Sequence, residues 1–490
     1  MSTKVEVNSD LKDINDLASS KSLKPDKISA RNNKMFITAP ASSRSGYGAH
    51  ARDLIWSFIQ LGKFDVNIVD VPWGNTPRDY FSGEMTKKDK EIHKRMLLEG
   101  TRIDYLPDYY VDIRIPNEFE LRGKVNIGIT AGIETNVVSQ NWIEKTNKMN
   151  LTIVPSKHSK DGFINTTYDK LQQQPDGKQV KIGELKSIDT GLHGQIETLF
   201  EGADEDIYKP LSPKEIDSEF FDWLNDEVPE KFAFLFVGLW GQGGFGEDRK
   251  DVGTLIKTFY ESFANKKKQP ALVLKTSGAS PSIMDKYEIR DKISHIKALF
   301  PKDWKLPNVY VLHGNLTDVE MNYLYNHPKI KAMVSFTHGE GYGRPLLEAS
   351  MVGLPVMCSA WSGQLDFLDK DLSLLLPGEL VDVPQSQHWK DIIVPESKWY
   401  KVSTESAYKG FNMLFEDYDL HKKNAKILMD RNRKQFTLNN MTEQLDIMIK
   451  HVISSLDNPN EASNHMGMMK PVGLNLPKMK NVEESENATV

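Results

Sequence analysis

The chain has 490 residues, more than one hydrophobic core usually supports, so a single globular domain is excluded and two domains are expected. Hydrophobic residues make up 39% and charged residues 27%, and 62 basic against 68 acidic residues give a formal net charge of -6. This mild acidity argues against a general polyanion-binding protein, although it leaves room for a local basic cleft. The single cysteine, Cys358, excludes an intrachain disulfide and fits a reducing compartment.

The two ends of the chain differ from its middle. Residues 1–33 are polar and lysine-rich, and residues 457–490 mix Pro, Gly, Asn and charge without periodicity, so both are expected to be flexible tails. No apolar signal core opens the sequence, and no run of about 18 apolar residues follows. A cytoplasmic protein without a membrane span is therefore expected.

Two series of apolar, β-rich segments lie between the tails, each separated by helical patterns. The first series comprises residues 35–40, 64–71, 110–116, 125–132 and 151–156, and the second comprises 232–240, 271–277, 309–314, 332–336 and 355–360. Continuous apolar segments of this length are typical of parallel strands covered on both faces. The sequence thus predicts an α/β protein with two doubly wound, Rossmann-like domains.

The domain bounds follow from the two series. We expect an N-terminal domain over residues 34–212 and a C-terminal domain over 213–456, joined near the proline-containing stretch 203–217. Ligands of such sheets bind beyond the carboxyl ends of the strands. The cleft between the two domains is therefore the expected site.

One stretch, "FTHGEGYGRPLLEASMVGLPV" (336–356), places a glycine-rich loop between a strand and a helix. Gly341 and Gly343 allow close approach of a ligand to the backbone, and the helix start offers free N–H groups to a phosphate. Glu340 on the loop and Glu348 one turn into the helix could accept hydrogen bonds from sugar or ribose hydroxyls. For Glu348 the alternative is an acid that only favours the helix dipole.

The segment "HGEGYGRPLLEAS" resembles the signature of retaining glycosyltransferases of family 4, also called group 1, which have the GT-B fold of two Rossmann-like domains facing across a cleft. The resemblance extends to "RKDVGTLIKTFYESF" (249–263), "LVLKT" (272–276), "LTDVEMNYLYN" (316–326), "PVMCSAWSGQLDFL" (355–368) and the acceptor-domain stretch 132–163. It implies a transferase that moves a sugar from a nucleotide-diphosphate sugar to a hydroxyl acceptor.

The resemblance also implies roles for individual residues. Glu340 would contact the donor sugar, Glu348 would hold the ribose, and backbone amides near Gly341, Tyr342 and Gly343 would meet the sugar and the diphosphate. Arg249 and Lys250 would neutralise the leaving diphosphate, where fixed cations are most effective. Alone, an adjacent Arg–Lys pair more often marks a solvated helix end.

Three further features lie near the predicted cleft. Gly46 and Gly48, in the loop after the first strand, could reach the diphosphate or only form a tight turn. Family members often place a histidine or an acid where Glu134 stands, so Glu134 is the candidate for contact with the reacting sugar. The histidines are not spaced as metal ligands, so surface or structural roles are expected for His50, His158, His193 and His338.

A G-x-G-x-x-G pattern in "GQGGFG" (241–246) raises the alternative of a nicotinamide cofactor. Its last glycine does not open the helix, because "EDRKD" intervenes, and no acid ends the next strand. An oxidoreductase is therefore disfavoured, and a loop over the donor is expected.

The resulting hypothesis is a retaining glycosyltransferase without a cofactor or metal, since no Asp-x-Asp lies in the donor loop region. The acceptor is unidentified and could be a glycan, a small molecule or a lipid. Three alternatives stay open: a phosphorylase or disaccharide synthase on the same scaffold, a non-catalytic nucleotide-sugar-binding protein, and a glycosyltransferase that modifies nucleic acid bases. The acidic balance counts against nucleic acid.

Overall fold

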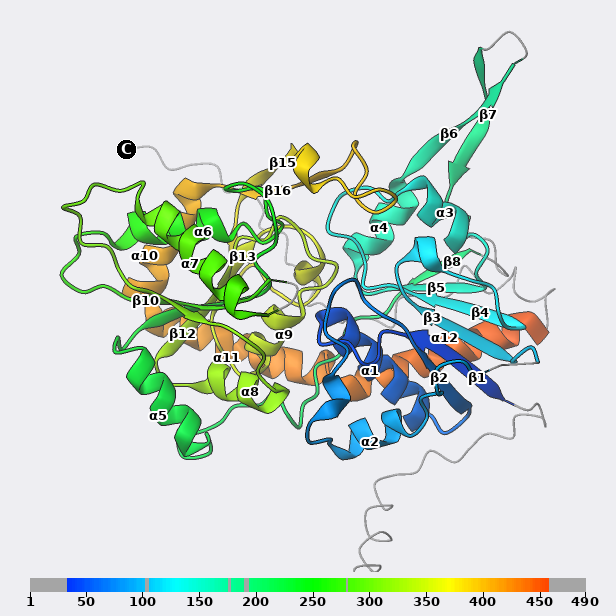
Figure 1. Ribbon diagram of the computed structural model, residues 1–490, viewed down its shortest axis with the longest axis horizontal. Coiled ribbons are helices and arrows are strands. Elements are labelled where there is room, and N and C mark those ends of the chain that lie inside the picture. Colours follow the sequence, from blue (N-terminus) through cyan, green and yellow to red (C-terminus); the bar gives the residue numbers. More distant parts are fainter. Residues whose placement is uncertain (1–32, 102–104, 175–177, 189–193, 279–280, 458–490) are drawn as a thin grey trace, which may run out of the picture.

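The computed structural model describes residues 33–101, 105–174, 178–188, 194–278 and 281–457. The two predicted tails, residues 1–33 and 457–490, fall outside the described residues except at their inner ends. The described chain forms two six-stranded parallel sheets with helices packed on them, arranged side by side (Figure 1). This agrees with the two doubly wound units expected from the sequence.

The first sheet has the strand order β2-β1-β3-β4-β5-β8, and all its neighbouring strands are parallel. Its strands are β1 (Lys34–Ala39), β2 (Asp65–Asp70), β3 (Tyr109–Ile113), β4 (Val125–Ile129), β5 (Leu151–Val154) and β8 (Gln195–Thr198). The helices that belong to it are α1 (Gly46–Gln60), α2 (Lys87–His93), α3 (Gln140–Thr146) and α4 (Lys157–Asn165).

The second sheet has the order β11-β10-β9-β12-β13-β14, also fully parallel. Its strands are β9 (Ala233–Val237), β10 (Ala271–Lys275), β11 (Val309–Leu312), β12 (Ile330–Ser335), β13 (Val356–Ser359) and β14 (Leu374–Leu376). The remaining helices are α5 (Ser218–Glu227), α6 (Val252–Phe263), α7 (Ile283–Lys297), α8 (Asp318–Asn326), α9 (Arg344–Met351), α10 (Thr404–Glu416), α11 (Tyr418–Gln435) and α12 (Leu438–Asp457).

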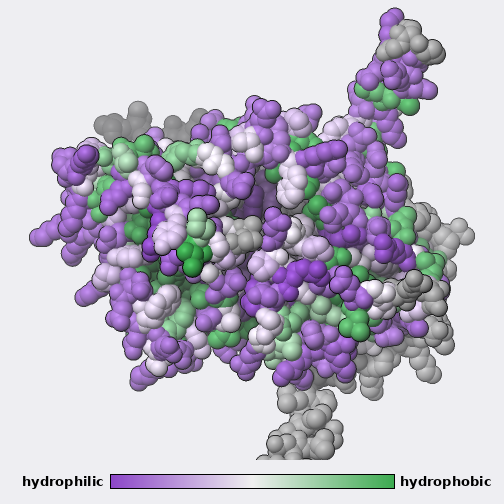
Figure 2. Space-filling view, in the orientation of Figure 1, coloured by the Kyte–Doolittle hydropathy of each residue, from purple (hydrophilic) through white to green (hydrophobic). Residues whose placement is uncertain are grey.

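All ten predicted strands are present, and their buried, β-branched side chains explain why the sequence signals them. The sequence does not signal β8, which carries a single apolar residue, Ile196, or β14, which contains only three residues. Two antiparallel pairs were also missed: β15 (Gly378–Asp382) with β16 (Lys398–Val402), and β6 (Thr167–Gln173) with β7 (Gln179–Lys186). The hairpin of β6 and β7 is mostly exposed and projects from the body, so no buried alternation marks it (Figures 1 and 2).

The last helix, α12, returns to the first half of the molecule and packs on α1. Met441 and Leu445 are fully buried there, and the hydroxyls of Ser57 and Thr442 lie 2.8 Å apart. The end of the described chain therefore ties the two halves together, while the exact bounds of the domains stay predictions. Within the described residues, each helix is too short or too polar to cross a bilayer.

The strand order determines which loops meet. In the second sheet the order reverses between β9 and β12, and ligands of open parallel sheets bind beyond the carboxyl ends of the strands at such a point. The loop after β9 carries Arg249 and Lys250, and the loop after β12 carries Glu340. Two segments about 90 residues apart in the sequence are thus adjacent in space.

The loop after β12 also touches the first half of the molecule. A Cβ atom at Gly341 would lie 1.9 Å from the carbonyl oxygen of Ala131, and one at Gly339 would lie 2.0 Å from that of Glu134. The hydroxyl of Ser156 donates a hydrogen bond to the carbonyl of Gly341 at 2.6 Å. Only glycine permits this approach of the two backbones.

We predict that Gly341→Ala separates the two halves and lowers the free energy of unfolding by about 2 kcal/mol or more, because the added carbon meets backbone that cannot move aside. Urea unfolding measures the loss, and small-angle scattering should show a larger radius of gyration. The control is Gly83→Ala, where a Cβ would meet no atom within 4 Å. Equal stability of the two variants would contradict the close approach.

Candidate active site

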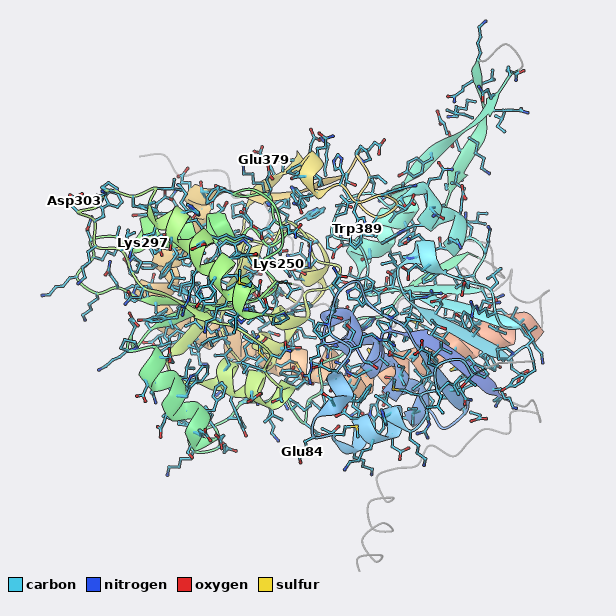
Figure 3. The ribbon with its side chains drawn as sticks, in the orientation of Figure 1. Glu84, Lys250, Lys297, Asp303, Glu379 and Trp389 are labelled. Carbon is cyan, nitrogen blue, oxygen red and sulfur yellow. The ribbon has the colours of Figure 1, made fainter. Side chains whose placement is uncertain are left out.

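The centre of the candidate site is the carboxylate of Glu340, held between two cations. Arg249 donates to Glu340 Oε2 at 3.2 Å, and the ammonium of Lys250 donates to Oε1. Arg249 also donates to the carbonyl of Gly339 at 3.0 Å. Lys250 lies near the middle of the molecule, between the two halves (Figure 3). The structure thus brings together three residues that the sequence analysis selected from two separate stretches.

The two cations keep Glu340 ionised although it is buried. Burial alone would raise the pKa of this carboxyl, but the charges of Lys250 and Arg249 and hydrogen bonds from Lys250 and Thr337 outweigh it and lower the pKa to about 2. Burial lowers the pKa of Lys250, and the charge of Glu340 opposes that effect. Arg249, which is 34% exposed, and Lys250 thus place two cations beside one buried carboxylate, an arrangement that can receive an anionic ligand.

Glu134 lies at the edge of the same cluster. Its carboxylate is 3.7 Å from Arg249 Nε, and its side chain is 35% exposed. It follows β4 in the first half of the molecule, so it faces the cations from the opposite side of the cleft. Glu134 therefore lies beside Arg249, and its contact with the reacting sugar stays a prediction.

The helix α9 begins directly beside Glu340, as the sequence predicted. Gly343 caps it in the left-handed conformation with φ of 98°, and proline occupies its first turn. The first amides of a helix have no partner within the helix, so this terminus adds donors for an anion. The ring of Tyr342 is buried 5.0 Å from Phe367, so this residue offers its backbone rather than its side chain to the cleft.

Glu348 lies in a second buried cluster, within α9. Arg344 Nε is 3.3 Å from Glu348 Oε1, and the hydroxyl of Tyr325 donates to Oε2 at 3.1 Å. Arg344 reaches across to the first half, where its Nη2 is 2.5 Å from Asp53 Oδ2 and its Nη1 is 3.9 Å from Glu201 Oε2. Both oxygens of Glu348 therefore already have a partner, and Arg344 links the two halves.

Two of the three carboxyls in the second cluster have a raised pKa, whereas that of Glu340 is lowered. Burial raises the pKa of Glu201 to about 8 and that of Glu348 to about 7, although the charge of Arg344 lowers both. Asp53 is buried too, but the charges of Arg344 and Lys88 outweigh burial and lower its pKa to about 2. One arginine thus faces three acids, of which two hold their protons more tightly than in water.

Gly46 and Gly48 open helix α1 in the first half. A Cβ at Gly48 would lie 2.2 Å from the carbonyl oxygen of Ser43, whereas one at Gly46 would meet no atom within 4 Å. The hydroxyl of Ser45 accepts a hydrogen bond from the amide of Gly48. The tight turn therefore requires glycine at position 48, and this is one of the two alternatives that the sequence left open.

The glycine-rich segment 241–246 is not a dinucleotide fingerprint. Helix α6 begins at Val252, six residues after Gly246, and the neighbouring strand β10 ends in Lys275 instead of an acid. The carboxylate of Glu247 accepts a hydrogen bond from the amide of Gly244 and one from the hydroxyl of Ser386. The segment is a loop, as expected, and it lies against the residues that follow β15.

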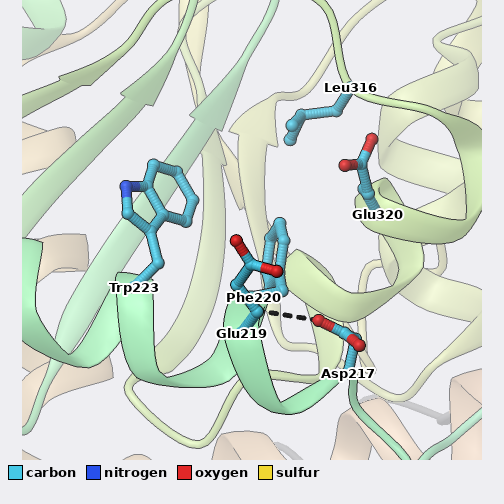
Figure 4. A pocket seen from close by; sticks show the side chains of 6 residues that line it. All are labelled: Asp217, Glu219, Phe220, Trp223, Leu316 and Glu320. Carbon is cyan, nitrogen blue, oxygen red and sulfur yellow. Dashed lines mark hydrogen bonds between the residues drawn. The ribbon is translucent and has the colours of Figure 1, made fainter.

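Two hollows of about 420 and 250 Å³ lie outside this constellation, beside α5, and Figure 4 shows the first. They share Trp223 and Leu316, and Lys275 and His313 line the second.

The sequence did not predict Arg344, Asp53 and Glu201 as residues of the site. Arg344 stands inside the recognised motif, but its partners come from two other segments whose contact only the fold reveals.

Comparison with known proteins identifies the fold. No model of a known protein family matches the sequence, and no curated protein is similar to it. Among solved structures, HepE from Anabaena in complex with UDP and glucose matches with a TM-score of 0.53 and 12% identity, over 85% of this chain and 99% of that one.

Two other structures give the same result. Sucrose-phosphate synthase from Thermosynechococcus elongatus matches with a TM-score of 0.55 at 12% identity, over 87% of this chain and 100% of that chain. A glycosyltransferase from Rickettsia africae matches with a TM-score of 0.52 at 11% identity, over 86% and 99%. The chain therefore has the GT-B fold of two Rossmann-like domains, as predicted.

We predict that Glu201→Gln flattens the pH dependence of stability. Between pH 5 and 8 the folded protein keeps the proton on Glu201 while the unfolded chain has lost it, so wild-type stability falls as pH rises through this window. The variant cannot ionise and should lose about 2 to 4 kcal/mol less across it. Urea unfolding at pH 5, 6, 7 and 8 measures the difference, and parallel curves would refute the assignment.

Proposed function

We propose that the protein is a glycosyltransferase that takes its sugar from a nucleotide-diphosphate sugar. The observation that carries this is the cluster of Arg249, Lys250 and Glu340 at the start of α9, because it combines two cations with a carboxylate fixed in its ionised form. A diphosphate fits the cations and the helix amides, and sugar hydroxyls fit Glu340.

The donor is proposed to be a uridine-diphosphate sugar, with UDP-glucose as the first candidate. HepE, which shares the fold, was solved in complex with UDP-glucose, although its sequence is only 11% identical. The family 4 signature around Glu340 and Glu348 supports the same class and implies transfer with retention of the anomeric configuration. The acceptor hydroxyl would enter from the side of Glu134, in the first half of the molecule.

The chain's own residues would act through charge and position. Arg249 and Lys250 would stabilise the negative charge that develops on the leaving diphosphate, which is the largest contribution that fixed cations can make. Glu340 would orient the sugar, and Glu348 would accept hydrogen bonds from the ribose on its remaining lone pairs. Closing the cleft would exclude water, so that transfer outruns hydrolysis. No metal ligand is assigned, and activity should survive a chelator.

The test is a thermal-shift and calorimetric panel of UDP-, GDP-, ADP- and CDP-sugars. We expect stabilisation by UDP-sugars, of about 2.7 kcal/mol at a ligand concentration of one hundred times Kd. Lys250→Met should weaken binding at least tenfold because it removes a buried phosphate contact. Glu348→Ala should weaken nucleotide binding as well. The matched control is Lys257→Met on α6, whose lysine pairs with Glu261.

Turnover is measured separately from binding. With UDP-glucose bound, proton NMR of the product should show the anomeric configuration retained, and Glu340→Gln should abolish most transfer. Binding without any transfer across a broad acceptor panel would favour the non-catalytic alternative. Absence of stabilisation by every nucleotide sugar would refute the proposal.

A further inference from the structure

His338 occupies a buried position in the loop that carries Glu340. It is 1% exposed, and both of its ring nitrogens face backbone carbonyls: Nδ1 is 2.6 Å from the oxygen of Tyr400, and Nε2 is 3.2 Å from the oxygen of Gly246. Its ring stacks on Trp399 with centroids 4.4 Å apart and an angle of 18° between the planes. Among the residues that the structure describes, these carbonyls are the nearest polar partners of the two nitrogens, and Asp251 Oδ2 follows at 3.9 Å from Nε2.

The protonation state follows from the partners. A carbonyl oxygen can only accept a hydrogen bond, so each ring nitrogen must donate. A neutral imidazole carries one N–H, and its other nitrogen would point a lone pair at a carbonyl oxygen. We infer that His338 is a buried imidazolium that fastens the loop carrying Arg249 and Lys250 to the loop carrying Glu340.

The charges around the ring favour a cation. Asp251 Oδ2 lies 3.9 Å from His338 Nε2, and Asp248 is buried in the same turn. Burial raises the pKa of Asp248 to about 6 and also that of Asp251, and the charge of His338 lowers both. From β16, Lys401 acts on Asp251 in the same direction. A cation at His338 therefore offsets two buried acids that would otherwise be difficult to ionise.

The contacts of His338 explain what its charge does. Its backbone N–H donates to the carbonyl of Arg249 at 2.7 Å. Its ring nitrogens contact the carbonyls of Gly246, three residues before Arg249, and of Tyr400 on β16. His338, two residues before Glu340, thus joins the loop after β12 to the loop after β9 and to β16. On the proposed function, which this inference extends, His338 is a positioning residue: it touches no substrate but sets where Arg249 and Lys250 meet the diphosphate.

The direct test is nitrogen NMR of the wild-type protein labelled with ¹⁵N-histidine, at pH 7.5. We expect both ring nitrogens of His338 to show the shifts of protonated nitrogens, while His158, whose pKa burial lowers to about 4, shows a neutral ring and serves as the internal control. His338→Gln and His158→Gln assign the signals. Neutron diffraction of wild-type crystals gives the same answer without a variant. A neutral His338 overturns the inference.

The positioning role is tested by comparing UDP with uridine. His338→Gln should weaken UDP binding about tenfold and leave uridine binding unchanged, because only the diphosphate meets Arg249 and Lys250. His421→Gln, on α11, is the control and should match wild type for both ligands. Equal weakening of UDP and uridine, or none, would overturn the positioning role. Should wild type bind no UDP, the proposed function fails, and the NMR result alone decides the charge of His338.

Discussion

The candidate site depends on one buried ionic contact, between Glu340 and the pair of Arg249 and Lys250. Burying any of these charges alone would cost several kcal/mol, so the cluster exists only because the strand order brings two loops to the same point. The same contact places two cations side by side at the cleft. The same three side chains therefore hold the two loops together and provide the cations that an anion would bind.

Two further features hold the halves of the molecule around this contact. Glycines at 339 and 341 let the loop after β12 lie directly on the backbone at Ala131 and Glu134. Arg344, one position after Gly343, reaches Asp53 and Glu201 from the other side. The signature segment thus does more than contact a ligand: its glycines and its arginine form much of the boundary between the halves. This explains how Glu134 comes to face Arg249.

The sequence predicted the ten principal strands and the neighbourhood of Glu340, because continuous apolar strands and a glycine-rich turn before a helix have local causes. It could not predict that Glu348 is enclosed by Arg344 and Tyr325, since that depends on side chains from separate elements. The short strands β8 and β14 and the exposed hairpin lack a periodic signal. For His338 the sequence predicts a surface or structural role but not its contacts, because the two carbonyl partners lie about 60 and 90 residues away.

The most direct test of the central contact is a double-mutant cycle on the free energy of unfolding. Lys250→Met, Glu340→Gln and the double variant give the coupling energy, and Lys257 with Glu261, a half-exposed pair on α6, serves as the reference. We predict about 2 to 3 kcal/mol or more for Lys250 with Glu340, because the pair is buried and Glu340→Gln leaves the ammonium of Lys250 without its carboxylate partner. Exposed ion pairs four residues apart on a helix typically have a coupling energy of about 0.3 to 0.5 kcal/mol. A value in that range for Lys250 with Glu340 would contradict the account.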